Sequence, residues 1–297
     1  MDDASRPDQD SLPGPGSVTW EHFAAAPGVF LAGTGLMLQV AHPVVGAGVL
    51  DHSEFKDRPW KRAWETHLST MRFVYGLGGG AHAEGRRLLE LHKDIKGVDR
   101  TGRRYHALNP EAYAWVHLTL ARYMVDTAKW FGDPMTDEEL EQMWQEFRAI
   151  GLALGIKQHH MPPDWASADA YFDEVVRTTL EANQSTTDVL TALTEPKKPI
   201  RYLPTPLWKL FAVPAGSLVR LTTVGTLPPV LRKRLGLSWT DRDQHSFDRL
   251  ATLVRAVHRR APGPLRYAPL AYGLMLRERL AQRRPARPSE VASTRAA

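Results

Sequence analysis

The residues from 23 to 50 include no aspartate, glutamate, lysine or arginine, and this uncharged stretch constrains the fold more than any other feature of the sequence. A segment of this length could cross a membrane as a helix. However, prolines, several glycines, Gln39 and His42 interrupt it, and many of its other side chains are small. We therefore predict a buried central helix over residues 26–48 that is broken near Pro43, with the other helices packed around it.

The rest of the chain repeats its apolar residues at helical spacing. The helix expected over residues 59–75 has one apolar stripe, formed by Trp60, Trp64, Leu68, Met71 and Tyr75. Further helices are expected over residues 81–97, 111–131, 136–155, from 167 onward, 240–260 and 268–282. Residues 201–237 are apolar and rich in proline, which favours several short helices there. Because no segment alternates with a period of two, we predict an all-α fold without a sheet.

Composition limits the chemistry that this chain can perform. Its 297 residues suffice for one large domain or two small ones. It has no cysteine, which excludes disulfides, thiolate metal sites and a cysteine nucleophile. A transition metal must therefore be held by carboxylates or by some of the 12 histidines, or arrive inside a cofactor.

The two ends of the chain differ from its middle. Residues 1–18 are acidic and rich in proline and glycine, and we interpret them as a disordered leader. They lack the basic start and apolar run of a secretory signal, which favours a cytoplasmic protein. Residues 283–297 are interpreted as a disordered basic tail, which leaves a single helical domain over residues 19–282. Much of the net charge of +5 lies near the C-terminus rather than on a folded face, so nucleic-acid binding is not expected.

His92 is the most informative polar residue of the helix expected over residues 81–97. Leu88 precedes it by four residues and Ile95 follows it by three, so the three share the apolar face of that helix. A histidine on such a face is either a core residue with satisfied hydrogen bonds or a ligand, and the core role is the commoner one. His117, on a stripe of small residues in a later helix, has the same two interpretations.

A glycine-rich run, residues 76–80, separates the helix of residues 59–75 from the helix of His92. It has no GxGxxG or Walker pattern and follows no strand, so we predict a turn between antiparallel helices rather than a phosphate-binding loop. Arg62 and Thr66 are four residues apart and share one face of the first helix. The helical hairpin should therefore bring Arg62, Thr66 and His92 within reach of one cavity.

Four segments occur in a recognisable order: LMLQVAHPVVGAGVLDHSEF, RAWET, RLLELHKDIKG and YHALNPEAYAWVHLTL. Together they resemble the MpaB and latex-clearing-protein family of b-type haem oxygenases, over residues 20–239. The resemblance implies an all-α fold with a globin-like haem-binding core, one haem b (iron) as the cofactor and O2 as a co-substrate. Members of the family include oxygenases that cleave rubber or isoprenoid side chains.

The resemblance also implies roles for individual residues. His92 corresponds to the proximal haem ligand of the family and would be the metal ligand here. Arg62 and Thr66 correspond to the arginine and threonine of the helix over the haem. The chemistry agrees, because a neutral imidazole is the usual proximal ligand of haem iron, and an arginine could stabilise negative charge that develops on oxygen.

Other signature positions have less defined roles. His42, Asp51 and His117 match the family's motifs, and His42 and His117 are further candidates to contact the cofactor. Arg104, together with Arg103, is a candidate to bind the haem propionates, which require cations and hydrogen-bond donors.

The residue directly before Thr66 is Glu65, where rubber-cleaving relatives have a lysine that can coordinate the iron. A carboxylate is a weaker partner for haem iron than a nitrogen donor, and burying its charge is costly unless a cation pairs with it. Arg62 lies three residues away, so such a pair is feasible. We therefore predict a distal side without a lysine ligand. Glu65 would be either a partner of Arg62 or a proton acceptor from substrate.

These inferences predict a haem b-dependent oxygenase that uses O2 on an apolar, unsaturated substrate such as an isoprenoid or a lipid. The alternative is a haem-binding sensor or carrier without turnover, because both would use the same pocket. A di-iron bundle is disfavoured because the chain has no Glu-x-x-His pair, and a serine hydrolase because it has no GxSxG elbow. Polymeric rubber is too large to enter a cell, which favours a smaller substrate. Residues 201–237 could line an entrance or contact a membrane surface peripherally.

Overall fold

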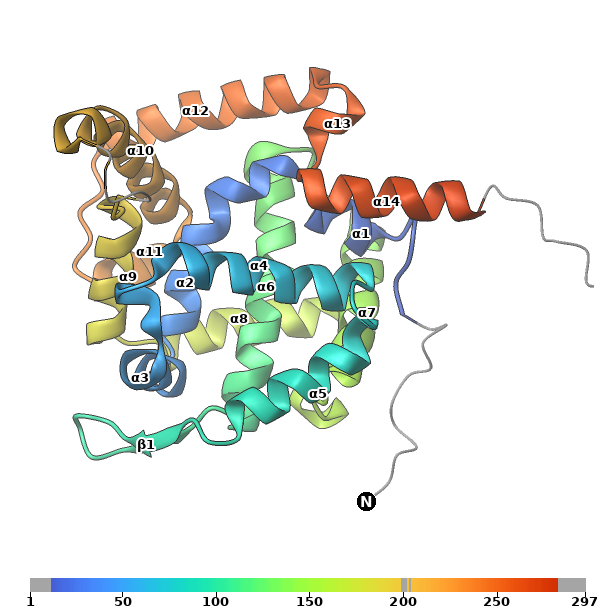
Figure 1. Cartoon of the computed structure of the whole chain (residues 1–297), viewed down its shortest axis with the longest axis horizontal. Coiled ribbons are helices and arrows are strands. Elements are labelled where there is room, and N and C mark those ends of the chain that lie inside the picture. Colours follow the sequence, from blue (N-terminus) through green and yellow to red (C-terminus); the bar gives the residue numbers. More distant parts are fainter. Residues whose placement is uncertain (1–11, 199–201, 203, 283–297) are drawn as a thin grey trace, which may run out of the picture.

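The computed structural model describes residues 12–198, 202 and 204–282 (Figure 1). Over these residues the chain is mainly helical, which confirms the predicted all-α fold. The helices are α1 (Val18–Phe23), α2 (Ala32–Val40), α3 (Pro43–His52), α4 (Pro59–Tyr75), α5 (Gly80–His92), α6 (Pro110–Phe131), α7 (Asp137–Ala153), α8 (Trp165–Thr178), α9 (Gln184–Thr194), α10 (Thr205–Thr226), α11 (Pro229–Arg234), α12 (Asp241–Arg260), α13 (Gly263–Arg266) and α14 (Pro269–Gln282). The predicted tail, and the predicted leader up to residue 11, lie outside the described residues.

Helix α6 runs through the middle of the molecule, and α4 crosses in front of it in Figure 1. The helix begins at Pro110, where the missing N–H costs nothing, and the side chain of Asn109 accepts a hydrogen bond from the backbone N–H of Ala112. Trp115 is fully buried, and its indole N–H donates to the carbonyl of Leu38 at 3.0 Å. This bond ties α6 to α2, so the two helices form the centre of the fold.

The uncharged stretch forms a short 3-10 helix (Ala26–Leu31), then α2 and α3. The predicted break near Pro43 is confirmed, because residues 26–40 and 43–52 meet at an angle of 100°. Buried residues of α2 include Met37 and Leu38, as expected for a core helix. Among the described residues no single helix has the length and apolar composition to cross a membrane, although this bent pair has both when taken together.

Side chains from the start of α9 bond to backbone carbonyls on both sides of the break. The amide nitrogen of Asn183 donates to the carbonyl of Val40 at 2.9 Å, and the hydroxyl of Ser185 donates to the carbonyl of Gly46 at 2.6 Å. A Cβ atom on Gly46 would lie 2.5 Å from the Val40 carbonyl oxygen. Only a glycine therefore lets α3 fold back this closely on the end of α2.

Two local predictions were wrong around His92. The helix expected over residues 81–97 ends at His92, so Ile95 lies beyond the helix. The chain then forms a two-stranded antiparallel sheet from β1 (Lys96–Val98) and β2 (Arg104–His106), where the sequence predicted none. These strands have three residues each, which is too short for an alternating pattern to stand out in the sequence.

The turn of this hairpin is built by one side chain. The carboxylate of Asp99 accepts hydrogen bonds from the backbone N–H groups of Thr101 at 2.8 Å and Arg103 at 2.9 Å. Gly102 has a φ of +85°, a conformation that most residues avoid. Aspartate and glycine at these positions are typical turn residues, so local chemistry closes the hairpin.

Residues 201–237 were expected to form several short helices, but α10 is one helix of 22 residues with Pro214 inside it. The proline removes one backbone hydrogen bond, and packing against neighbouring elements outweighs that loss. A Cβ atom on Gly216 would lie 1.9 Å from the carbonyl oxygen of Thr194 at the end of α9. The hydroxyls of Thr34 and Thr226 are hydrogen-bonded at 2.5 Å, which joins α10 to α2.

Candidate functional site

The helix pair α4 and α5 carries the residues with predicted catalytic and ligand roles. Gly76 and Gly79 have φ values of +72° and +99°, which allow the chain to reverse between the two helices. Arg62 and His92 lie at the end of the pair farthest from this turn. The positive charge of Arg62 reaches the His92 ring and contributes to lowering its pKa. Arg62 is therefore close enough to His92 to act on it electrostatically, and the cavity predicted to join Arg62, Thr66 and His92 stays a prediction.

His92 is the last residue of α5, and its ring stands edge-on to Tyr113 with the ring centroids 6.2 Å apart. Its Nδ1 atom is buried and makes no hydrogen bond of good geometry among the described residues, although the backbone carbonyl of Leu88 interacts with the ring. Burial lowers the pKa of His92, and the carbonyl of Leu88 partly opposes this effect. The charges of Arg62 and Arg87 lower it further. The ring is therefore neutral at pH 7, and a neutral imidazole has a nitrogen lone pair to offer to a metal.

Arg62, Glu65 and Thr66 interact with one another on α4. Nη1 of Arg62 lies 3.4 Å from Oε2 of Glu65, which confirms that these two residues form an ion pair. The hydroxyl of Thr66 donates to the carbonyl of Arg62 at 2.9 Å. Both charged side chains are 43% exposed, and such pairs are worth less than about 1 kcal/mol. Arg62 can therefore leave Glu65 for a stronger anionic partner.

A buried carboxylate that the sequence analysis missed lies between α4 and α5. The side chain of Glu84 is 1% exposed and accepts hydrogen bonds from Ser69 at 2.5 Å and from two nitrogens of Arg87 at 2.5 and 2.8 Å. Arg72 lies 3.6 Å from it. Burial alone would raise the pKa of Glu84, but these hydrogen bonds and charges outweigh burial and hold it below its ordinary value. The sequence could have indicated that Glu84 is buried, because Glu84 lies four residues before Leu88 and therefore on the apolar face of α5.

Tyr113 of α6 contacts the ring of His92 and is influenced by the charge of Glu84. Burial and the charge of Glu84 raise the pKa of Tyr113 to about 12. Its hydroxyl is buried without a hydrogen-bond partner among the described residues, and Nδ1 of His92 makes no hydrogen bond of good geometry there. Because unpaired buried polar atoms cost free energy, these two neighbours are positions where a bound group could compensate.

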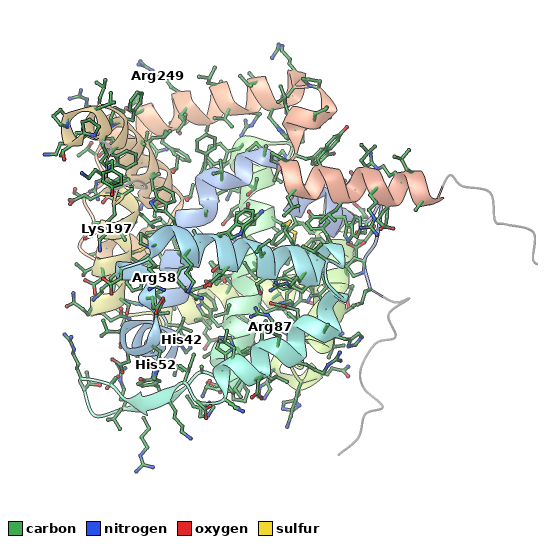
Figure 2. All side chains as sticks on the ribbon, viewed as in Figure 1. His42, His52, Arg58, Arg87, Lys197 and Arg249 are labelled. Atoms are coloured by element: carbon green, nitrogen blue, oxygen red, sulfur yellow. The ribbon has the colours of Figure 1, made fainter. Side chains whose placement is uncertain are left out.

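His42 and Asp51 lie on a different part of the molecule. Figure 2 shows His42 and His52 at α3, to the left of Arg87 on α5. His42 is buried at the break before α3, and its Nδ1 also lacks a partner among the described residues. Burial lowers the pKa of His42, and acidic residues nearby partly oppose this. Asp51 accepts a hydrogen bond from the hydroxyl of Tyr105 at 2.5 Å, which joins α3 to β2.

The predicted propionate-binding arginines lie on the β hairpin. Arg104 is exposed on β2. Arg103 donates to Asp99 through Nε at 2.8 Å and to both carboxylate oxygens of Glu181 at 2.7 and 2.9 Å. The guanidinium of Arg103 is therefore already engaged in ion pairs.

His117 has the geometry of a core histidine. Its Nε2 is hydrogen-bonded to the carbonyl of Phe147 at 2.8 Å, and its ring stacks on Phe147 with centroids 4.3 Å apart. A Cβ atom on Gly151 would lie 2.8 Å from this nitrogen, so α7 makes room for the ring. Burial lowers the pKa of His117 to about 4. The structure places His117 against α7, and its bonded nitrogen is not free for a cofactor.

Two cavities border this region without including His92 or Arg62 in their walls. One of about 460 Å³ lies between α3, the tip of the β hairpin and the start of α9. A smaller one of about 160 Å³ is lined by Leu89, Tyr113 and residues that follow α7. Within the described ranges, no group of three or more histidine and acidic side chains could hold a metal ion by itself. A single imidazole such as His92 instead suits iron that arrives inside a cofactor.

Comparison with known proteins agrees with the motifs in the sequence. The family model for the catalytic domain of the ER-bound oxygenase mpaB/B' and rubber oxygenase matches residues 20–256. Uncharacterised proteins of Mycobacterium tuberculosis and Mycobacterium bovis are each 28% identical to this chain over 238 residues, which are 79% of this chain and 90% of the relative. No solved structure matches. The chain belongs to the family of mpaB and rubber oxygenase catalytic domains.

Proposed function

We propose that this protein is a haem b-dependent oxygenase that uses O2 on an apolar, unsaturated substrate of isoprenoid or lipid-like chemistry. The proposal goes beyond membership of an oxygenase family, which gives neither the cofactor nor the substrate. One observation carries it: the neutral ring of His92 has a buried nitrogen that makes no well-formed hydrogen bond among the described residues, within reach of the charge of Arg62.

The residues at the end of the α4 and α5 pair supply the kinds of side chain that a haem requires. Haem iron requires one axial nitrogen from the protein, and His92 is held at the end of a helix. The haem propionates require cationic donors, and Arg104, which is exposed on β2, stays the candidate for that role. Haem would supply the iron that activates O2.

The protein side chains would then perform separate tasks. The guanidinium of Arg62 can donate hydrogen bonds to an anionic oxygen once it leaves Glu65. The carboxylate of Glu65 can hold Arg62 in place or accept a proton from substrate. The Thr66 hydroxyl is satisfied within its helix, so it can accept a further hydrogen bond without losing its own.

Replacing the ligand tests the cofactor assignment. His92→Ala should purify with little haem, whereas wild type should hold about one haem per chain. His82→Ala, at the start of the same helix, is the control and should keep the wild-type Soret band. Full haem occupancy with an unchanged spectrum in His92→Ala would place the ligand elsewhere, with His42 as the next candidate.

Oxygen uptake tests turnover. The haem-loaded protein should consume O2 and form carbonyl products with at least some short alkenes or isoprenoids. If it binds haem but is inactive with every such compound, the alternative of a haem sensor or carrier without turnover is favoured.

A further inference from the structure

The first half of α10 exposes an apolar stripe to solvent. Leu210 and Phe211 are 66% and 63% exposed, although buried positions are usual for such residues. On the opposite side of the helix, Gly216 packs against the end of α9. Figure 1 shows α10 at the margin of the molecule. The stripe consists of Leu207, Leu210, Phe211, Pro214 and Leu218 at helical spacing.

The charged residues in the sequence segment that contains α10 are all basic. Residues 196–240 contain eight lysines and arginines and no aspartate or glutamate. Lys209 lies within the exposed half of α10, and Lys197 and Lys198 precede the helix. A long segment that combines exposed apolar side chains with only basic charges is complementary to a surface that is apolar inside and anionic outside.

Two exposed tryptophans lie on α4, and one of them is bonded to the segment that leads into α10. Trp60 and Trp64 of α4 are 52% and 57% exposed, although the sequence had placed both on the apolar stripe of that helix. The indole N–H of Trp60 donates to the carbonyl of Lys197 at 3.2 Å, which ties α4 to the segment leading into α10. Tryptophan is enriched at the boundary between lipid and water because its ring is apolar and its N–H is polar.

We propose that this surface, which we call the α10 face (Leu207, Leu210, Phe211, Lys209, Trp60 and Trp64), docks the protein on an anionic lipid bilayer. A second copy of the chain is a poorer occupant, because two such faces would oppose two copies of residues 196–240, whose charged side chains are all basic. The consequence for substrate rests on the proposed function. Trp60 and Trp64 lie on the same turns of α4 as Arg62 and Glu65, so an apolar substrate leaving the bilayer would arrive next to the site.

Vesicle flotation with the full chain tests the proposal. Wild type should bind vesicles of phosphatidylcholine mixed with phosphatidylglycerol in about 0.1 M salt, and far less in about 1 M salt or to phosphatidylcholine alone. The double variant Leu210→Ser/Phe211→Ser should bind about tenfold more weakly or worse. Lys209→Glu should weaken binding about fivefold, and added salt should reduce the difference from wild type.

The control variant is Leu253→Ser/Val257→Ser on α12, whose side chains are 61% and 60% exposed. It should bind vesicles as wild type does, and all variants should keep the wild-type circular dichroism. The proposal is wrong if wild type does not bind anionic vesicles or if the α12 control loses as much binding as the α10 variant. It is also wrong if wild type is a dimer that Leu210→Ser/Phe211→Ser converts to monomer.

The assay separates this proposal from the proposed function. Vesicle binding is measured on the protein whether or not it carries haem. Protein that binds anionic vesicles through the α10 face but lacks a haem spectrum would refute the haem assignment and leave the docking surface intact. Protein that binds haem through His92 but does not bind anionic vesicles would refute the docking surface and leave the haem assignment intact.

Discussion

His92 and His117 both lie on inward-facing sides of helices, yet their surroundings give them opposite properties. His117 has its nitrogen bonded to a carbonyl of α7 and its ring stacked on Phe147. His92 has a buried nitrogen that makes no hydrogen bond of good geometry among the described residues. The sequence left both residues with the same two interpretations, because the carbonyl that distinguishes them comes from a helix 30 residues away.

The burial of His117 predicts a pH dependence of stability. Its pKa falls to about 4 from an ordinary 6.5, so the folded protein keeps the ring neutral while the unfolded chain binds a proton. Its contribution should be complete above pH 6.5 and should decline as the pH falls towards 4, by about 2 kcal/mol at pH 5. Urea unfolding at several pH values would measure this. His117→Gln should flatten the decline, and an unchanged pH dependence in that variant would contradict the assignment.

Glu65 predicts the resting spectrum of the haem-loaded protein. With no lysine at this position, the ferric protein should be mainly high-spin and should bind imidazole or cyanide readily. Glu65→Lys places an amine where the rubber-cleaving relatives have one, so that variant should gain a low-spin fraction that resists added imidazole. A wild-type spectrum that is already low-spin with two nitrogen ligands would contradict this and indicate a second histidine.

At the scale of elements, Glu84 joins α4 to α5. Glu84→Ala should lower the free energy of unfolding by about 2 kcal/mol, because charge-assisted hydrogen bonds from Arg87 and Ser69 are lost. Denaturant unfolding at pH 7 would measure this. Because the pKa of Glu84 is lowered in the folded state, its contribution is present at neutral pH and is lost as the pH falls below about 4.5. Glu90→Ala, on the exposed side of the same helix, is the control and should change stability by less than about 0.5 kcal/mol.

The packing of α10 on α9 gives a second prediction at this scale. Gly216→Ala should destabilise the protein by about 1–3 kcal/mol, because the added methyl group would meet the Thr194 carbonyl. Gly273→Ala, whose added Cβ would contact nothing within 4 Å, is the matched control and should be neutral or slightly stabilising. Equal thermal midpoints for wild type and Gly216→Ala would contradict the close approach.

Elements could be predicted where residues in the sequence itself mark their beginning and end. The helix α4 was predicted with its observed ends, because Pro59 favours a first turn and Gly76 takes a left-handed conformation after the last one. The end of α5 was missed because Asp99 builds a hairpin that is too short to show a strand pattern. The unbroken α10 was missed because contacts with α9 and α2 outweigh the proline inside it. Arg62, Glu65 and His92 followed from helical spacing and family motifs, whereas Glu84 required the packing of two helices.

At the scale of the whole molecule, cofactor binding and stability should be coupled. A ligand that binds only the folded state stabilises it by about 2.7 kcal/mol when its free concentration is 100 times its Kd. Adding haem should therefore raise the thermal midpoint of wild type and His82→Ala but not that of His92→Ala. A similar rise in all three would mean that haem binds without His92.

The elbow between α2 and α3 has a consequence for how the chain is made. Its carbonyl at Val40 is bonded by Asn183, 143 residues later, and its carbonyl at Gly46 by Ser185, 139 residues later. During synthesis, α2 and α3 therefore leave the ribosome long before Asn183 and Ser185, which bond to them. Such non-local closure is slow and leaves apolar surface uncovered in the meantime. Nascent chains that end before Asn183 should remain sensitive to protease and dependent on chaperones, and resistance should appear only once α9 has emerged.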